Sequence, residues 1–153
     1  MKIPTLLMLL LFAIQPSSKL RAIPSSLAGQ WEIGKPFYDM AAPPVGINAK
    51  QENKLIGEIL DIRTTSVSAC GTSIQITSIE ATTYSSDAFL QEYRIRPDQI
   101  GLVAPLTEYS FISHGLTAIC GSLEAFVIVS DGKNAVLDIA NDYFHLNKVK
   151  TVR

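Results

Sequence analysis

The sequence predicts an all-β domain, an antiparallel up-and-down barrel of about eight strands with one short helix. Its apolar runs are short, rich in Ile, Val, Thr and aromatic residues, and separated by turn residues, which is typical of strands. Only one stretch carries both start and stop signals of a helix. This many strands in one small domain must protect their edges, and a closed barrel does so completely. A two-sheet β-sandwich is the alternative.

The first 22 residues predict an export signal, which leaves residues 23–153 as a single barrel domain. Lys2 supplies a positive end, Leu6–Ile14 is an apolar stretch of signal-peptide length, and Ala22 is a small residue suited to cleavage. The apolar stretch is too short to cross roughly 30 Å of hydrocarbon. We therefore expect a periplasmic or secreted protein without a membrane span.

The two cysteines are expected to form one disulfide, because an exported chain reaches an oxidising compartment. Both Cys70 and Cys120 stand before a glycine, which suggests strand ends followed by a turn. A bridge between them closes a long loop, and chain entropy for that length corresponds to at most about 4 kcal/mol of stability.

Strands are expected wherever a short apolar run lies between turn residues. The clearest signal is at the C-terminal end, where Asp131-Gly132 forms the tip of a hairpin because glycine tolerates positive φ. Asn141-Asp142 marks the next turn, so the last three strands form an antiparallel meander. The expected strands are Gln30–Ile33, Lys54–Arg63, Ile74–Thr82, Tyr109–Ser113, Leu116–Cys120, Ala125–Ser130, Ala135–Ile139 and Tyr143–Lys148.

The expected helix lies between the third and fourth of these strands. Ser85 or Ser86 can cap it, Asp87 suits its positive end, Ala88–Tyr93 fills it and Pro97 prevents its continuation. Two stretches rich in turn residues, 36–50 and 97–106, are predicted as long loops. Long loops in a small domain are often functional.

The opening of the mature domain, Leu27-Ala28-Gly29-Gln30-Trp31-Glu32, resembles that of the calycin barrels, the lipocalins and their relatives. The resemblance implies that Gly29 lets the chain bend over the closed end of the barrel while the indole of Trp31 plugs it. It also implies a basic side chain of the last strand stacked on the indole. Lys148 is the candidate, because it shares the inward parity of Phe144 and Leu146, and Lys150 is the alternative. The opening is also similar to small secreted bacterial barrels that inhibit proteases and, more loosely, to periplasmic lysozyme inhibitors.

Charge and motif content exclude several function classes. Residues 1–22 hold three of the 13 basic side chains and none of the 14 acidic ones, so the remainder carries a net charge of -4. Such a domain is a poor match to nucleic acid. His114 and His145 stand alone among apolar or small residues, and no nucleotide-binding, hydrolase or metal-binding motif occurs. We expect no cofactor, no metal and no enzymatic activity.

Acidic residues offer little further chemistry at this level. Asp138 is interpreted as part of a solvated strand face, and Asp142 as part of a turn. Carboxylate pairs could arise only if the fold gathered the separate glutamates, which are Glu80, Glu92, Glu108 and Glu124.

Two hypotheses for function remain. The first is a secreted barrel that binds a protein, inhibiting an envelope-acting hydrolase of lysozyme or protease type or giving immunity to a toxin. Tyr38, Met40 and Tyr109 would serve as anchors, although the same side chains could instead cover the barrel mouth. The second is a carrier of an apolar small molecule, for which the many large apolar residues predict a mostly filled interior.

Overall fold

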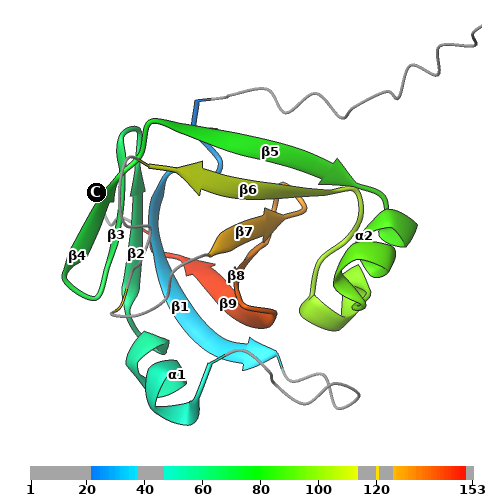
Figure 1. Ribbon diagram of the computed structural model, residues 1–153, viewed down its shortest axis with the longest axis horizontal. Coiled ribbons are helices and arrows are strands. Elements are labelled where there is room, and N and C mark those ends of the chain that lie inside the picture. Colours follow the sequence, from blue (N-terminus) through cyan, green and yellow to red (C-terminus); the bar gives the residue numbers. More distant parts are fainter. Residues whose placement is uncertain (1–21, 38–46, 114–119, 121–125, 151–153) are drawn as a thin grey trace, which may run out of the picture.

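The computed structural model describes residues 22–37, 47–113, 120 and 126–150. In this part of the chain, nine strands form one antiparallel sheet that curls into a half-barrel (Figure 1). The strands are β1 (Gly29–Phe37), β2 (Ile59–Arg63), β3 (Ser66–Ala69), β4 (Thr72–Gln75), β5 (Ser78–Tyr84), β6 (Leu106–Ile112), β7 (Val127–Ser130), β8 (Ala135–Ile139) and β9 (Asp142–Lys148). The all-β prediction is confirmed.

The strand order is that of an up-and-down barrel with one break. Strands β1 to β4 and β5 to β9 are each joined as consecutive antiparallel neighbours, and β1 pairs with β9 to unite the two halves. At the break, the N–H of Ile76 donates to the carbonyl of Thr65, whereas the N–H of Thr77 donates to the carbonyl of Ile112 beyond the gap. The chain therefore passes from one half of the sheet to the other within one residue, and β4 and β5 are its edges.

This crossover explains one difference from the sequence prediction. The single strand expected over 74–82 is divided into the end of β4 and most of β5. A second difference concerns 54–63, where the strand begins only at Ile59. Gly57 has a φ of +88° just before it, and Lys54 and Leu55 belong to a helix. Strand β3 was not predicted, because its sequence Ser-Val-Ser-Ala is short and half polar.

Two α-helices are present in the described residues, and one of them was predicted. Helix α2 (Ser86–Tyr93) begins after Ser85, whose Oγ accepts the N–H of Ala88 at 3.2 Å. Helix α1 (Ala49–Leu55) lies where a loop was expected up to Lys50. A capping box starts α1, since the Asn48 side chain accepts the N–H of Gln51 and the Gln51 side chain accepts the N–H of Asn48. The stretch 97–106, also expected as a loop, opens with the 3-10 helix η1 (Pro97–Ile100).

The predicted C-terminal meander is confirmed. Strands β7, β8 and β9 are consecutive antiparallel neighbours, and Gly132 in the β7–β8 turn has a φ of +90°. The turn between β8 and β9 centres one residue earlier than expected, on Ala140 and Asn141, which both have positive φ. Two of the expected strands cannot be compared in full. Residues 116–119 of the strand expected over 116–120, and residue 125 of the strand expected over 125–130, lie outside the described residues.

The concave, inner face of the sheet holds the larger apolar core. Alternate residues of a strand point to opposite faces of the sheet. The inward-pointing side chains of both halves of the sheet meet in one cluster. Its most completely buried members include Ile33, Leu60, Ile79, Ile128 and Phe144. An extra residue in β1 between Ile33 and Pro36 reverses the alternation, so that Phe37 lies on the outer face.

A second core covers the outer face of β6 to β9. Phe89 of α2 and Ile100 of η1 pack there against Val129 and Val136. Asp138 shares this outer face with Val136, and it is only 6% exposed. The interpretation of Asp138 as part of a solvated face is therefore wrong, because the inner face of β8 packs in the first core and its outer face adjoins the second.

None of the helices in the described residues is long and apolar enough to cross a lipid bilayer.

Candidate functional site

Trp31 lies where the first strand pairs with the last, opposite Lys148 of β9. The indole N–H donates to the carbonyl of Leu27 at 2.8 Å, and the Nζ of Lys148 lies 5.0 Å from the centroid of the ring. The same ammonium group donates to the carbonyl of Ser26 at 2.9 Å. Gly29 has a φ of +116°, where a side chain would be strained. These contacts join the end of β9 to β1 and to the segment that precedes β1.

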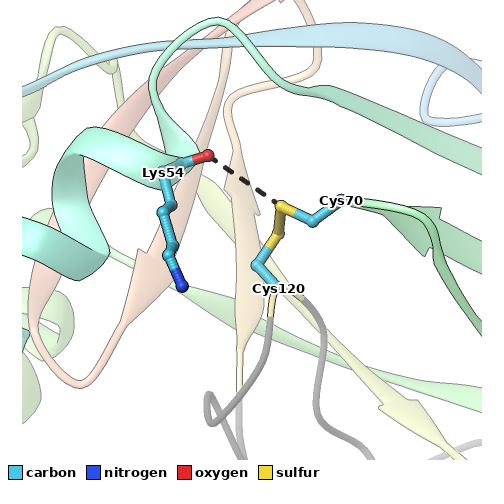
Figure 2. The surroundings of a disulfide bond; sticks show 3 residues. All are labelled: Lys54, Cys70 and Cys120. Atoms are coloured by element: carbon cyan, nitrogen blue, oxygen red, sulfur yellow. Dashed lines mark hydrogen bonds between the residues drawn. A yellow bond between two sulfur atoms is a disulfide. The ribbon is translucent and has the colours of Figure 1, made fainter.

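The cysteine pair lies beside helix α1 (Figure 2). Cys70 and Cys120 lie at disulfide distance, with an S–S separation of 1.98 Å across 50 positions of the sequence. Figure 2 shows the Sγ of Cys70 facing the carbonyl oxygen of Lys54 in α1, at 4.0 Å. The pair thus joins the β3–β4 turn to the segment that follows β6, beside α1. A bonded pair of this kind fits an extracellular protein.

An apolar cavity of about 170 Å³ lies between the two halves of the sheet. The rings of Phe111 and Phe126 pack at its wall, with centroids 5.3 Å apart. The remaining lining residues are Val67, Ile74, Ile76, Ser110 and Val127. The space is comparable to an engineered cavity of about 150 Å³ that accepts benzene.

The loop between η1 and β6 presents the most exposed large apolar side chain of the described residues. Val103 is 73% exposed, whereas Leu102 beside it is 2% exposed and Leu106 is fully buried. The two leucines anchor the loop in the outer core on either side of Val103. Hydrogen bonds fix its backbone, since the N–H of Leu102 donates to the carbonyl of Pro97 at 2.9 Å and the N–H of Val103 donates to the Oδ2 of Asp131 at 3.1 Å.

Asp131 links this loop to the tip of the β7–β8 hairpin. Burial alone would raise its pKa, but hydrogen bonds from the N–H groups of Asn134 and Lys133, from the Asn134 side chain and from the N–H of Val103 outweigh that effect. The pKa of Asp131 is therefore held below its ordinary value, and the carboxylate stays ionised at neutral pH. We refer to residues 101–105, held in this way, as the Val103 loop.

The predicted site residues fall in three places. Gly29, Trp31 and Lys148 lie together where β1 pairs with β9, and Cys70 and Cys120 lie beside α1. The proposed anchor Tyr109 lies on β6, half-buried against the inner core, not on a loop. The other proposed anchors, Tyr38 and Met40, lie outside the described residues.

Of the two histidines, His145 is exposed on β9, as expected, and its ring packs on Phe37 with centroids 3.5 Å apart. His114 lies outside the described residues. No group of three or more His, Cys, Asp or Glu side chains that could hold a metal ion occurs among residues 22–37, 47–113, 120 and 126–150.

Sequence reasoning predicted a loop over 97–106 but missed the exposure of Val103 within it, and it missed the burial of Asp138. For Val103 the sequence carries no distinguishing signal, because Leu102, Val103 and Leu106 are equally apolar. For Asp138 a signal exists. Val136 and Asp138 share one face and Leu137 and Ile139 the other, and a strand with apolar residues on both faces is typically covered on both.

Comparisons of the chain with protein-family models, with curated proteins and with solved structures found no match. The curled antiparallel sheet is compatible with a calycin-like barrel.

Proposed function

We propose that the protein is an exported, non-enzymatic binding module that inhibits, or gives immunity against, an envelope-acting hydrolase of the lysozyme or protease type. The Val103 loop is the observation that carries this proposal. A cleft-binding inhibitor needs an exposed side chain on a backbone that is already held in its bound shape, because ordering a loop on binding costs free energy. Val103 is 73% exposed, and its loop is pinned at both ends and at its own N–H.

The chemistry of the loop suits a hydrolase cleft. The exposed side chain is apolar and β-branched, so it can enter a hydrophobic subsite with little loss of rotamer freedom. Leu102 and Leu106 remain in the outer core, so replacement of Val103 leaves the packing intact. The signal peptide expected at residues 1–22 supports a periplasmic or extracellular place of action, as does the cysteine pair at disulfide distance. The non-enzymatic part of the proposal is supported by the lack of catalytic motifs in the sequence.

The test is inhibition of a panel of muramidases and of serine and cysteine proteases by the purified mature protein. Val103→Asp should weaken inhibition of the sensitive enzyme by at least about tenfold, because a buried apolar anchor contributes more than about 1 kcal/mol. Its melting temperature should stay within about 2 °C of the unmodified protein. Val149→Asp, which alters an exposed apolar residue directly after β9, is the matched control. Equal inhibition by the Val103 and Val149 variants, or no inhibition of any enzyme at micromolar concentration, contradicts the proposal.

The cavity between the two halves of the sheet favours a second candidate, a carrier of an apolar small molecule. Its volume of about 170 Å³ would hold a molecule near the size of benzene. Sites for larger ligands usually measure about 300 to 1,000 Å³, and for this reason the protein-binding function ranks first. Mass spectrometry of organic extracts of the purified protein separates the two. A stoichiometric apolar compound that is lost in the Val67→Phe variant would reverse the ranking.

A further inference from the structure

A row of polar side chains crosses the outer face of the sheet, next to the core that α2 covers. The strand register places Ser110, Val127, Asp138 and Tyr143 directly beside one another on β6, β7, β8 and β9. Glu108 joins the row from β6, where its Oε1 accepts a hydrogen bond from the hydroxyl of Ser110 at 3.5 Å. Two carboxyl groups and a phenol thus gather around the small side chain of Val127.

Two oxygen atoms of this row are buried without a hydrogen-bond partner among the described residues. They are the Oε2 of Glu108 and the hydroxyl of Tyr143. Tyr143 is only 4% exposed, and its hydroxyl group interacts electrostatically with both Asp138 and Glu108. Buried polar groups of folded proteins are ordinarily hydrogen-bonded. A ligand with several N–H donors could pair with both oxygens, since a carboxylate accepts hydrogen bonds and a phenol accepts as well as donates them.

The surroundings of the row are acidic. Besides Glu108 on β6, Asp138 and Asp142 come from β8 and β9, and Glu92 comes from α2. Burial first, and repulsion from Glu108 and Asp142 second, raise the pKa of Asp138 to about 7. In the described residues, no Lys, Arg or His forms an ion pair with this group, because the two ion pairs present join other residues. The row thus has an excess of negative charge at neutral pH.

An aromatic wall stands beside the acidic groups. Tyr84, Phe89 and Tyr93 pack on one another, with ring centroids between 4.6 and 5.9 Å apart. Burial raises the pKa of Tyr84, and the negative charges of Glu108 and Glu92 raise it further. Aromatic faces combined with carboxylates are the usual surroundings of ammonium groups in proteins.

We propose that the row formed by Glu108, Asp138 and Tyr143 is a binding site for an organic cation that carries N–H donors, a primary ammonium group. The ammonium enters past Glu108, which is only half-buried, and donates to the two unpaired oxygens. Its charge offsets the repulsion among the carboxylates. The absence of a third metal-binding side chain among the described residues favours this cation over a metal ion. The site is independent of the Val103 loop and of a hydrolase partner.

The probe is methylammonium chloride, added to the mature protein while the ¹³C resonance of the Asp138 carboxyl group is titrated with pH. Saturating methylammonium should lower the titration midpoint of Asp138 by about one pH unit, because a nearby positive charge favours the ionised carboxylate. Tetramethylammonium chloride and sodium chloride at equal ionic strength should leave the midpoint unchanged, since neither cation has an N–H to donate. No shift with methylammonium, or the same shift with all three cations, overturns the proposal.

Variants test which side chains hold the cation. Glu108→Gln should raise the methylammonium concentration required for half of the effect by at least about tenfold. Tyr143→Phe, which removes the unpaired hydroxyl, should also weaken binding, by about threefold or more. Glu32→Gln, which removes an exposed carboxylate from β1, is the matched control and should bind as the unmodified protein does. Trp31 emission verifies that each variant is folded. Binding that is unchanged in both the Glu108 and the Tyr143 variant overturns the assignment.

A last comparison identifies the source of the ammonium group. N-acetyl-lysine N-methylamide carries the same group on a long side chain. If it binds more tightly than methylammonium, the site serves a lysine side chain of a partner protein. If only methylammonium binds, the ligand is a small free amine. If neither lowers the midpoint of Asp138, no ammonium site is present and the proposal fails, whatever the result for hydrolase inhibition.

Discussion

Replacing Asp138 by Asn should stabilise the protein by an amount that increases with pH. Asp138 is buried on the outer face, and its pKa is raised from 3.8 to about 7. In the unfolded chain the same carboxyl group ionises near its ordinary value. Between these two pH values unfolding releases a proton, so a rise in pH favours the unfolded state. Above about pH 7 the folded protein must carry a buried, repelled carboxylate, and the full cost applies.

The magnitude follows from the difference between the two pKa values. Each pH unit between them corresponds to about 1.4 kcal/mol, so the interval from 3.8 to about 7 corresponds to at most about 4 kcal/mol. Asparagine has nearly the same shape as aspartate, and its Oδ1 can still accept the N–H of Asn141, which now donates to Asp138 at 2.9 Å. The substitution therefore removes the charge and keeps the bond that supports the β8–β9 turn.

The assay is urea unfolding followed by Trp31 emission, with both proteins measured in amine-free buffers from about pH 4 to about pH 8. The difference in unfolding free energy between variant and unmodified protein is the quantity of interest, because the other carboxyl groups titrate in both and cancel. It should increase along this range and level off above about pH 7. Glu32→Gln controls for the change in net charge. A difference that stays constant within about 0.5 kcal/mol would refute the argument that Asp138 is buried without a positive partner.

Three further predictions concern stability. Trp31→Ala should lower the unfolding free energy by about 3 to 5 kcal/mol, because it removes a buried indole and its bond to Leu27; a loss below about 1 kcal/mol in urea unfolding contradicts this. Phe89→Ala should lower the unfolding free energy by about 3 to 5 kcal/mol, whereas Leu90→Ala, at the exposed neighbour on α2, should change it by no more than about 0.5 kcal/mol. Equal losses of stability in thermal unfolding would show that α2 does not cover the sheet. Replacing both Cys70 and Cys120 by Ser should lower the unfolding free energy by at most about 4 kcal/mol, since the loop spans 50 positions. Calorimetry should show the same loss when the unmodified protein is reduced. An unchanged melting temperature counts against the pairing.

Local patterns in the sequence determined the fold class and several of its details. Strand runs bounded by turn residues predicted an all-β fold, and the Asp131-Gly132 tip predicted the β7–β8 hairpin, because only a few residue types tolerate positive φ there. The cap at Ser85 and the stop at Pro97 located α2. The parity of β9 predicted that Lys148 would share the inner face with Phe144 and Leu146, and the structure has its ammonium over Trp31. Such features depend only on residues that are close together in the sequence, so one sequence is enough to predict them.

Other features were decided only by contacts between distant segments. The break between β4 and β5 depends on which carbonyl each of two successive N–H groups finds, Thr65 for Ile76 and Ile112 for Thr77, and no local pattern contains that choice. Helix α1 was missed because its seven residues are largely polar, and its single buried side chain, Leu55, acquires a partner only in the fold.

The candidate sites were also decided by contacts between distant segments. Val103 is exposed because Leu102 and Leu106 are held in the outer core and Asp131, 28 positions away, binds its backbone. Asp138 is buried beside the outer core, on a face that the strand alone would leave to solvent, and the register of β6, β7 and β8 brings Glu108 to the same face. Exposure, burial and the pKa of a side chain are properties of its surroundings, so the sequence determined the strands and only the tertiary structure decided which of their side chains could bind a partner.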